Sequence, residues 1–274
     1  MNYVTLNNGV KIPQIGLGVF RLPEEEEAVR TVKMGLENGY RHIDTATIYQ
    51  NEAAVGRAVR ESGVPRDEIF ITTKVWNDKQ RTGEVEASFE ASLKALDTDY
   101  IDLYLVHWPV PAYFKNTWKK LEKIYSSGKI RAVGVSNFRI QDLKALEEVS
   151  DLVPAVNQIE LQPYFQQYEL VEYCESKGIK VEAWGPFTAG KTGLFKEPVL
   201  VNLSEKYGKT PAQIILRFDV QRGIIPLPKS SSPARQKENL DVFDFELTNE
   251  EMGMLKSMDC GGRVGRNPDN SDFE

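Results

Sequence analysis

Residues 39–52 read GYRHIDTATIYQNE: a strand-like run ends in an acid, and a tyrosine follows five residues later. Two later segments share the first half of this layout, IFITTK at 69–74 and IDLYLVH at 101–107. Each segment is typical of a buried strand that carries one ionisable side chain at its carboxyl end. In a closed barrel of parallel strands these ends meet on one face, where such barrels place their active sites. The repeated layout therefore predicts a site built from strand ends.

The expected site contains Asp44, Tyr49, Lys74 and His107. Side chains alternate between the two faces of a strand, so residues two apart share a face. Counting back by two makes each reactive group the last member of an inward-facing column. The expected columns are Asp44 with His42 and Tyr40, Lys74 with Thr72 and Phe70, and His107 with Leu105 and Leu103.

The whole chain, residues 1–274, is expected to form a single (β/α)8 barrel domain with an N-terminal β-hairpin and a short C-terminal tail. An Asn-Gly turn at residues 8–9 predicts the hairpin. Eight strands are expected at 14–17, 40–43, 69–73, 101–106, 132–135, 155–158, 180–183 and 223–226. Helices are expected at 24–37, 53–61, 83–95, 117–126, 141–148, 168–176, 199–207, 211–221 and 234–239. A doubly wound sheet is the alternative, but the glycines at 16 and 18 lack the third glycine of a dinucleotide loop.

The last part of the chain contains one more expected helix, at 248–258, followed by a glycine-rich tail. Two interpretations of the tail stay open. It folds over the mouth of the barrel, or it is a disordered terminus.

The composition of the chain argues against several classes of protein. There are 34 Lys and Arg against 40 Asp and Glu, a net charge of −6, which argues against general binding to nucleic acid or anionic membranes. Two cysteines without CxxC spacing and the absence of a signal peptide or long apolar run favour a cytoplasmic protein. Two histidines cannot build a His-rich metal site, so no metal is expected. No long exposed apolar stripe is visible, and we expect a monomer.

The four strand-end groups suit proton delivery to a carbonyl. A phenol with a pKa of about 10 is a weak acid at neutral pH. A lysine ammonium ~4 Å from Tyr49 would lower its pKa by roughly three units at most. Asp44 would keep Lys74 charged and aimed, and His107 could orient the substrate oxygen. Taken singly, each of these residues is more often structural; their common level in the barrel favours a site.

Residues after the later strands suggest a nicotinamide cofactor. The segment 227–239 carries three cations and three serines before its first acid, and barrels often bind phosphate at this place. Lys229, Ser230 and Arg235 would suit a ribose 2′-phosphate, hence NADPH over NADH, although a solvated basic loop is equally compatible. Trp184 could stack on the nicotinamide. The carboxamide of the nicotinamide would be hydrogen-bonded by Ser136, Asn137 and Gln158.

Together these motifs resemble the aldo-keto reductase superfamily across essentially the whole chain. The matching segments are 39–52, 73–76, 106–109, 134–138 and 228–230, with Arg235, Glu238 and Asn239. The chain is most similar to the microbial branch of 2,5-diketo-gluconate reductases and small aldehyde/glyoxal reductases. The resemblance implies NADP(H)-dependent reduction of small aldehydes and ketones.

Residue roles follow from the resemblance. It implies Tyr49 as the proton donor, Lys74 and Asp44 as residues that tune it, and His107 as the substrate-orienting group. The implied walls of the substrate pocket are Phe20, Trp76 and Trp108, beside His107. The implied cofactor contacts are Ser136, Asn137, Gln158, Trp184, Gly185, Phe187, Lys229, Ser230, Ser231, Arg235, Glu238 and Asn239.

The chain departs from the family pattern in two places. Many relatives carry a hydroxyl residue and a leucine where this chain has Gly185 and Phe187, which removes one expected pyrophosphate contact. The loop at 110–116 and the tail are short compared with those of the larger aldose-reductase-like members. A shorter rim predicts an open pocket and broad substrate choice. Two other functions remain open: a binding or structural role, and a lyase that uses Lys74 as a Schiff-base nucleophile.

Overall fold

The computed structural model describes residues 2–22 and 24–270; the last four residues of the predicted tail lie outside this part. Eight parallel strands follow one another around a single sheet, each beside its neighbour in the chain. They are β3 (Leu17–Gly18), β4 (His42–Asp44), β5 (Phe70–Val75), β6 (Ile101–Val106), β7 (Ile130–Ser136), β8 (Val156–Glu160), β9 (Lys180–Trp184) and β10 (Ile225–Leu227). The predicted barrel architecture is confirmed.

The first and last strands meet and close the barrel. The backbone N–H of Gly16 donates to the carbonyl of Pro226 at 3.1 Å, and that of Gly18 donates to Pro228 at 3.1 Å. Glycine is required at position 16, because a Cβ there would lie 2.6 Å from Nδ1 of His42. The segment that follows β10 therefore starts beside the carboxyl end of β3.

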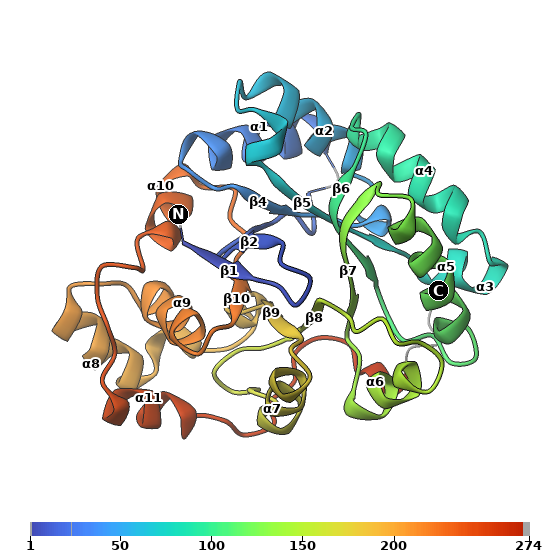
Figure 1. Ribbon diagram of the computed structural model, residues 1–274. Helices are drawn as coiled ribbons and strands as arrows, with labels where there is room; N and C mark the ends of the chain where they lie inside the picture. The colour runs from blue at the N-terminus through green and yellow to red at the C-terminus, as the bar shows by residue number, and fades with distance from the viewer. Residues whose placement is uncertain (1, 23, 271–274) are drawn as a thin grey trace.

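Helices surround the strands, as Figure 1 shows. They are α1 (Glu25–Glu37), α2 (Glu52–Glu61), α3 (Asn77–Thr82), α4 (Val85–Leu96), α5 (Phe114–Ser126), α6 (Ile140–Glu147), α7 (Tyr168–Ser176), α8 (Pro198–Tyr207), α9 (Pro211–Gln221), α10 (Pro233–Leu240) and α11 (Asn249–Lys256). Each expected helix is present within a few residues of its expected bounds, while α3 was not expected. Within the described residues, no helix has the length and apolar composition needed to cross a bilayer.

The N-terminal hairpin closes one end of the barrel (Figure 1). Its strands, β1 (Tyr3–Thr5) and β2 (Lys11–Pro13), pair antiparallel. Leu6 and Ile12 pack with the side chains that fill the barrel interior, among them Phe70, Leu103 and Leu105. The hairpin thus occupies the amino-terminal end of the barrel, and the carboxyl ends of the strands are at the opposite mouth.

Two details of the sequence prediction were wrong. Tyr40 does not face the barrel interior; it packs with Leu36 in the apolar layer between strands and helices. The reason is that β4 begins at His42, so the alternation of the strand does not extend back to residue 40. The first strand was expected at 14–17, but Gln14 still pairs with Asn2 of the hairpin, and the barrel strand begins at Leu17.

Candidate active site

A buried ion pair lies at the carboxyl ends of β4 and β5. The Lys74 ammonium donates to both carboxylate oxygens of Asp44 at 2.8 Å and to the backbone carbonyl of Thr45 at 2.8 Å. Lys74 is fully buried, which opposes its charge, but the acidic groups around it, Asp44 first among them, together outweigh that effect and raise the pKa of Lys74 above its ordinary value. Lys74 is therefore held as a cation.

Tyr49 ends the short 3-10 turn that follows β4, and its ring lies 5.1 Å from the Lys74 ammonium. Burial raises the pKa of Tyr49; the charge of Lys74 and a hydrogen bond between the two side chains act in the opposite direction. The predicted attraction of the Lys74 charge is present, but it does not lower the pKa of Tyr49 overall, because desolvation is the largest effect and the negative charge of Asp44 adds to it.

Asn51 fixes the turn that carries Tyr49. Its amide nitrogen donates to the carbonyls of Val19 and Leu22, at 2.9 and 3.2 Å, and its oxygen accepts from Thr45 at 2.6 Å. These bonds tie the loops after β3 and β4 together. Asn51 was not predicted as a site residue, although it follows Tyr49 by only two positions.

His107 follows β6 directly and faces Tyr49, with ring centroids 5.8 Å apart. Burial, together with the positive charge of Lys74, holds the pKa of His107 well below its usual range. The imidazole is therefore neutral, and a neutral imidazole can donate one hydrogen bond to a carbonyl oxygen.

Aromatic side chains border these two groups. Phe20 packs against Tyr49 at 4.9 Å between ring centroids and is 52% exposed. Trp76 packs against His107 at 4.9 Å, and the buried Trp108 stacks beside the same imidazole at 6.5 Å. The three predicted wall residues thus surround Tyr49 and His107.

The predicted nicotinamide contacts lie on three neighbouring strands: Ser136 and Asn137 at the end of β7, Gln158 within β8 and Trp184 at the end of β9. The amide nitrogen of Asn137 donates to the hydroxyl of Ser136 and the carbonyl of His107, both at 3.0 Å. The indole of Trp184 donates to the Asn137 oxygen at 2.9 Å, and the Ser136 hydroxyl to the Gln158 carbonyl at 2.9 Å. The structure connects these residues to one another and to His107.

The predicted phosphate-binding segment, residues 227–239, leaves the barrel rim beside Gly18, which pairs with Asp44 in the sheet. Lys229, Ser231 and Arg235 are exposed, and Ser230 is buried. Among the described residues, no ion pair involves Lys229 or Arg235. Lys229 just before α10 and Arg235 in its first turn, both without an ion-pair partner among these residues, fit a phosphate group.

Other predicted cofactor residues already have partners in the protein. The Glu238 carboxylate accepts from the Thr210 hydroxyl at 2.6 Å, and Asn239 is buried. Phe187 packs against Phe195 at 5.5 Å between ring centroids. Gly185 has φ +68° with open space at its Cβ position, so a side chain would fit there but would be strained.

The described part of the tail folds over the barrel mouth. The buried Glu160 of β8 accepts from the backbone N–H groups of Val264 and Gly265, at 2.7 and 2.9 Å. Gly265 lies against the indole of Trp184, where an added Cβ would be 2.2 Å from Cη2. Of the two interpretations that the sequence left open, the folded tail is the correct one for residues up to 270.

Glu182 of β9 is a site residue that the sequence prediction missed. It is fully buried, and its carboxyl Oε2 accepts from Gln158 Nε2 at 2.7 Å. Gln158 Nε2 also donates to Asp44 at 2.8 Å. An acid two residues before Trp184, and so on the same face of the strand, was the available signal.

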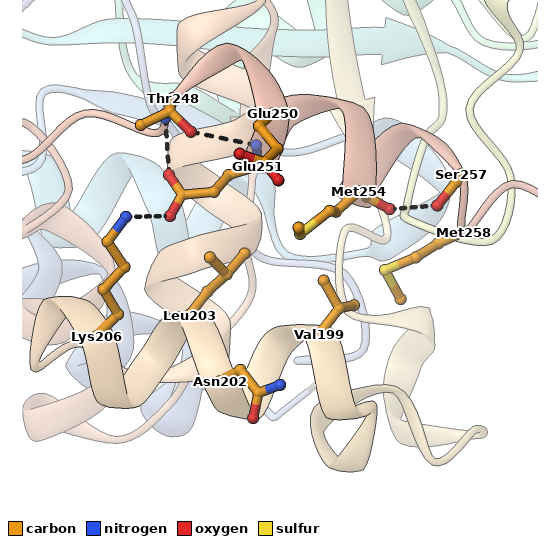
Figure 2. A pocket seen from close by; sticks show the side chains of 10 residues that line it. All are labelled: Val199, Asn202, Leu203, Lys206, Thr248, Glu250, Glu251, Met254, Ser257 and Met258. Atoms are coloured by element: carbon orange, nitrogen blue, oxygen red, sulfur yellow. Dashed lines mark hydrogen bonds and ion pairs between the residues drawn. The ribbon is translucent and has the colours of Figure 1, made fainter.

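A separate surface pocket of about 640 Å³ lies between α8 and α11 (Figure 2). It is bordered by Leu203, Met254 and Met258, with the ion pair of Lys206 and Glu251 at one side. None of the predicted site residues lines it.

Comparison with known proteins supports one family. Residues 14–259 match the model of the aldo/keto reductase family. Glyoxal reductase of Bacillus subtilis (strain 168) is 48% identical over 97% of this chain and 96% of its own length. An aldo/keto reductase structure from Brucella melitensis has a TM-score of 0.90 and 46% identity over 94% of this chain and 99% of that one. The Bombyx mori aldo-keto reductase, solved in complex with NADP, has a TM-score of 0.93 and 38% identity over 99% of this chain and 97% of that one. The chain belongs to the aldo/keto reductase family.

Proposed function

We propose that Asp44, Tyr49, Lys74 and His107 carry out the reaction of this aldo/keto reductase, the NADPH-dependent reduction of aldehydes and ketones to alcohols. One observation carries the assignment. A phenol bonded to a buried, charged ammonium faces a neutral imidazole at the mouth of the barrel. This is the arrangement that a carbonyl oxygen needs in order to receive a proton.

The residues of the barrel mouth suit the cofactor. Lys229 and Arg235 are the proposed ligands of a 2′-phosphate, since both are exposed and neither takes part in an ion pair among the described residues. Ser136, Asn137 and Gln158 would hold the carboxamide, with Trp184 against the ring. When bound, NADPH supplies the hydride that reduces the carbonyl carbon.

Each catalytic side chain has a separate task. His107 donates a hydrogen bond to the carbonyl oxygen and aligns it with the Tyr49 hydroxyl. Tyr49 transfers its proton to that oxygen, and the Lys74 ammonium stabilises the phenolate that remains. Asp44 neutralises the buried lysine and holds it toward the phenol. Solvent then returns a proton to Tyr49.

The geometry argues against the lyase alternative. A Schiff-base lysine must lose its proton before it can attack a carbonyl. Lys74 instead has three contacts to acceptor oxygens and a raised pKa.

The proposed substrates are small aldehydes, including 2-oxoaldehydes such as methylglyoxal. Phe20 is half exposed at the rim, and a relative of 48% identity is named glyoxal reductase. We further propose that the chain works as a single domain and as a monomer.

The experiment is loss of NADPH absorbance with a panel of small aldehydes, for the wild type and for Tyr49→Phe. Removing a general acid should lower kcat by about 10²–10⁴-fold while NADPH still binds. His107→Phe tests the orienting role and should raise KM as well as lower kcat. If Tyr49→Phe reduced aldehydes at the wild-type rate, the assignment of Tyr49 would be refuted. If the wild-type protein reduced none of the aldehydes, the proposed substrate class would be refuted.

A further inference from the structure

We propose that Glu182 is a positioning residue for the cofactor. Together with Asp44 it would fix the side-chain amide of Gln158 so that only the carbonyl oxygen of Gln158 is available to the nicotinamide carboxamide. The inference rests on the proposed function, because it takes Gln158 to be a carboxamide contact.

The three side chains form a bridge across the inside of the barrel. Gln158 and Glu182 are direct partners in the pairing of β8 with β9. Gln158 Nε2 donates to Glu182 Oε2 at 2.7 Å and to Asp44 Oδ2 at 2.8 Å. All three residues are buried, each at most 4% exposed, so water competes little for these bonds.

This bridge determines which end of the amide is free. A primary amide nitrogen has two hydrogens, and here each has an acid as its acceptor. The reverse orientation would place the Gln158 oxygen against two carboxyl oxygens. Even a protonated Glu182 could donate in only one of those contacts, and Asp44, which is paired with Lys74, would still repel the oxygen. The orientation with the nitrogen toward both acids is therefore favoured.

Glu182 can accept this bond in either protonation state. Burial, and next the negative charge of Asp44, raise the pKa of Glu182 to about 8. The charged or titratable groups around it are Asp44 and His42 of β4 and Lys74 of β5. His42 Nε2 lies 3.8 Å from Oε1, and burial lowers the pKa of His42 to about 3, so the imidazole is neutral. Oε2 keeps its lone pairs whether or not Oε1 carries a proton.

The orientation of the Gln158 amide determines which group of the cofactor it can recognise. With both hydrogens engaged, Gln158 can only accept a hydrogen bond from the cofactor. It would therefore recognise the NH₂ of the carboxamide and discriminate against a cofactor in which a methyl group replaces that NH₂. This would fix which way the carboxamide points above Gln158.

The test measures the binding of NADP⁺ and its 3-acetylpyridine analogue by calorimetry, so it does not depend on turnover. The wild type should bind NADP⁺ about three- to tenfold more tightly than the analogue, the effect of one hydrogen bond. In Glu182→Met, which keeps the length but has no comparable acceptor, one N–H of Gln158 loses its partner and only Asp44 still orients the amide, so the ratio should decrease. Glu182→Gln still offers an oxygen to Gln158 and should keep the wild-type ratio. Gln158→Leu is the control that should abolish it.

The outcomes separate this inference from the proposed function. A wild type that does not bind NADP⁺, or that does not discriminate, would overturn the assignment of Gln158 and this inference with it. Discrimination that persists unchanged in Glu182→Met would overturn the role of Glu182 alone. Should Glu182→Met not fold, ¹⁵N spectra of the wild type decide: both Gln158 amide protons should be hydrogen-bonded, and a spectrum in which either one is not would overturn the inference.

Discussion

At the scale of single residues, the site depends on how much each charge costs to bury. Lys74 and Asp44 compensate each other inside the barrel, which leaves Glu182 as a second acid close to Asp44 without a cation of its own. Two carboxyl groups that share one amide cannot both be ionised cheaply. Burial first, and next the negative charge of Asp44, raises the pKa of Glu182 to about 8.

Glu182 should make stability decrease with pH. In the unfolded chain a glutamate loses its proton near pH 4.3, whereas in the folded protein Glu182 keeps it up to about pH 8. Between these values the folded state binds the extra proton, so this residue lowers the unfolding free energy by up to about 1.4 kcal/mol per pH unit as pH rises. Above about pH 8 its contribution levels off.

Glu182→Gln should remove that slope. Urea unfolding between pH 5 and pH 8 should show the variant becoming more stable relative to the wild type as pH rises. Glu205→Gln, at an exposed acid on α8, is the control and should leave the slope unchanged. Parallel pH profiles for the wild type and Glu182→Gln would show that Glu182 does not hold a proton in the folded protein.

At the scale of elements, α10 and the loop before it should determine cofactor choice. Arg235→Ala should weaken the binding of NADPH by roughly 10- to 100-fold, the range for one charge-assisted hydrogen bond, and change that of NADH little. Lys237→Ala removes an exposed cation from the same helix and serves as the matched control. Fluorescence titration measures the affinity of the wild type and of both variants for each cofactor. Equal weakening of both cofactors would place the 2′-phosphate elsewhere.

The tail is the second element with a defined contact to the site. Gly265→Ala should displace either the tail or Trp184, because the added Cβ would be 2.2 Å from the indole. We expect faster proteolysis of the tail and a changed Trp184 environment in fluorescence. Gly193→Ala adds the same methyl group where a Cβ meets nothing within 4 Å and should behave as the wild type. An unaltered tail in Gly265→Ala would contradict the packing described.

At the scale of the whole molecule, the barrel separates stability from chemistry. The hairpin fills one end of the barrel, and the reactive groups lie at the other. Ile12→Ala should therefore cost about 2–5 kcal/mol of unfolding free energy, because it empties space inside the barrel, while KM stays unchanged. Tyr3→Ala, at a half-exposed position of the same hairpin, should cost far less. Chemical denaturation and steady-state kinetics give the two values, and a large change in KM for Ile12→Ala would show that the two ends are coupled.

The sequence alone was enough to predict the barrel and the four-residue cluster. Strand and helix periods, turn glycines and one ionisable group per strand end are local features, and parallel strands bring such ends to one face. The same reasoning failed for Tyr40, where the alternation was extended past the start of β4. It also missed α3, which follows directly from the end of β5.

Tertiary structure decided what depends on distances between separate strands. Three features depend on residues that are far apart in the sequence. They are the direction in which the pKa of Tyr49 shifts, the hydrogen bonds from the Gln158 amide to two acids, and the hydrogen bonds from the tail to Glu160. Each is a balance of desolvation against a few close contacts, and these energies change steeply over one or two ångströms. The sequence pattern predicts which side chains are present at the mouth of the barrel. The distances and burial in the folded structure determine how strongly each charge or hydrogen bond affects its neighbours.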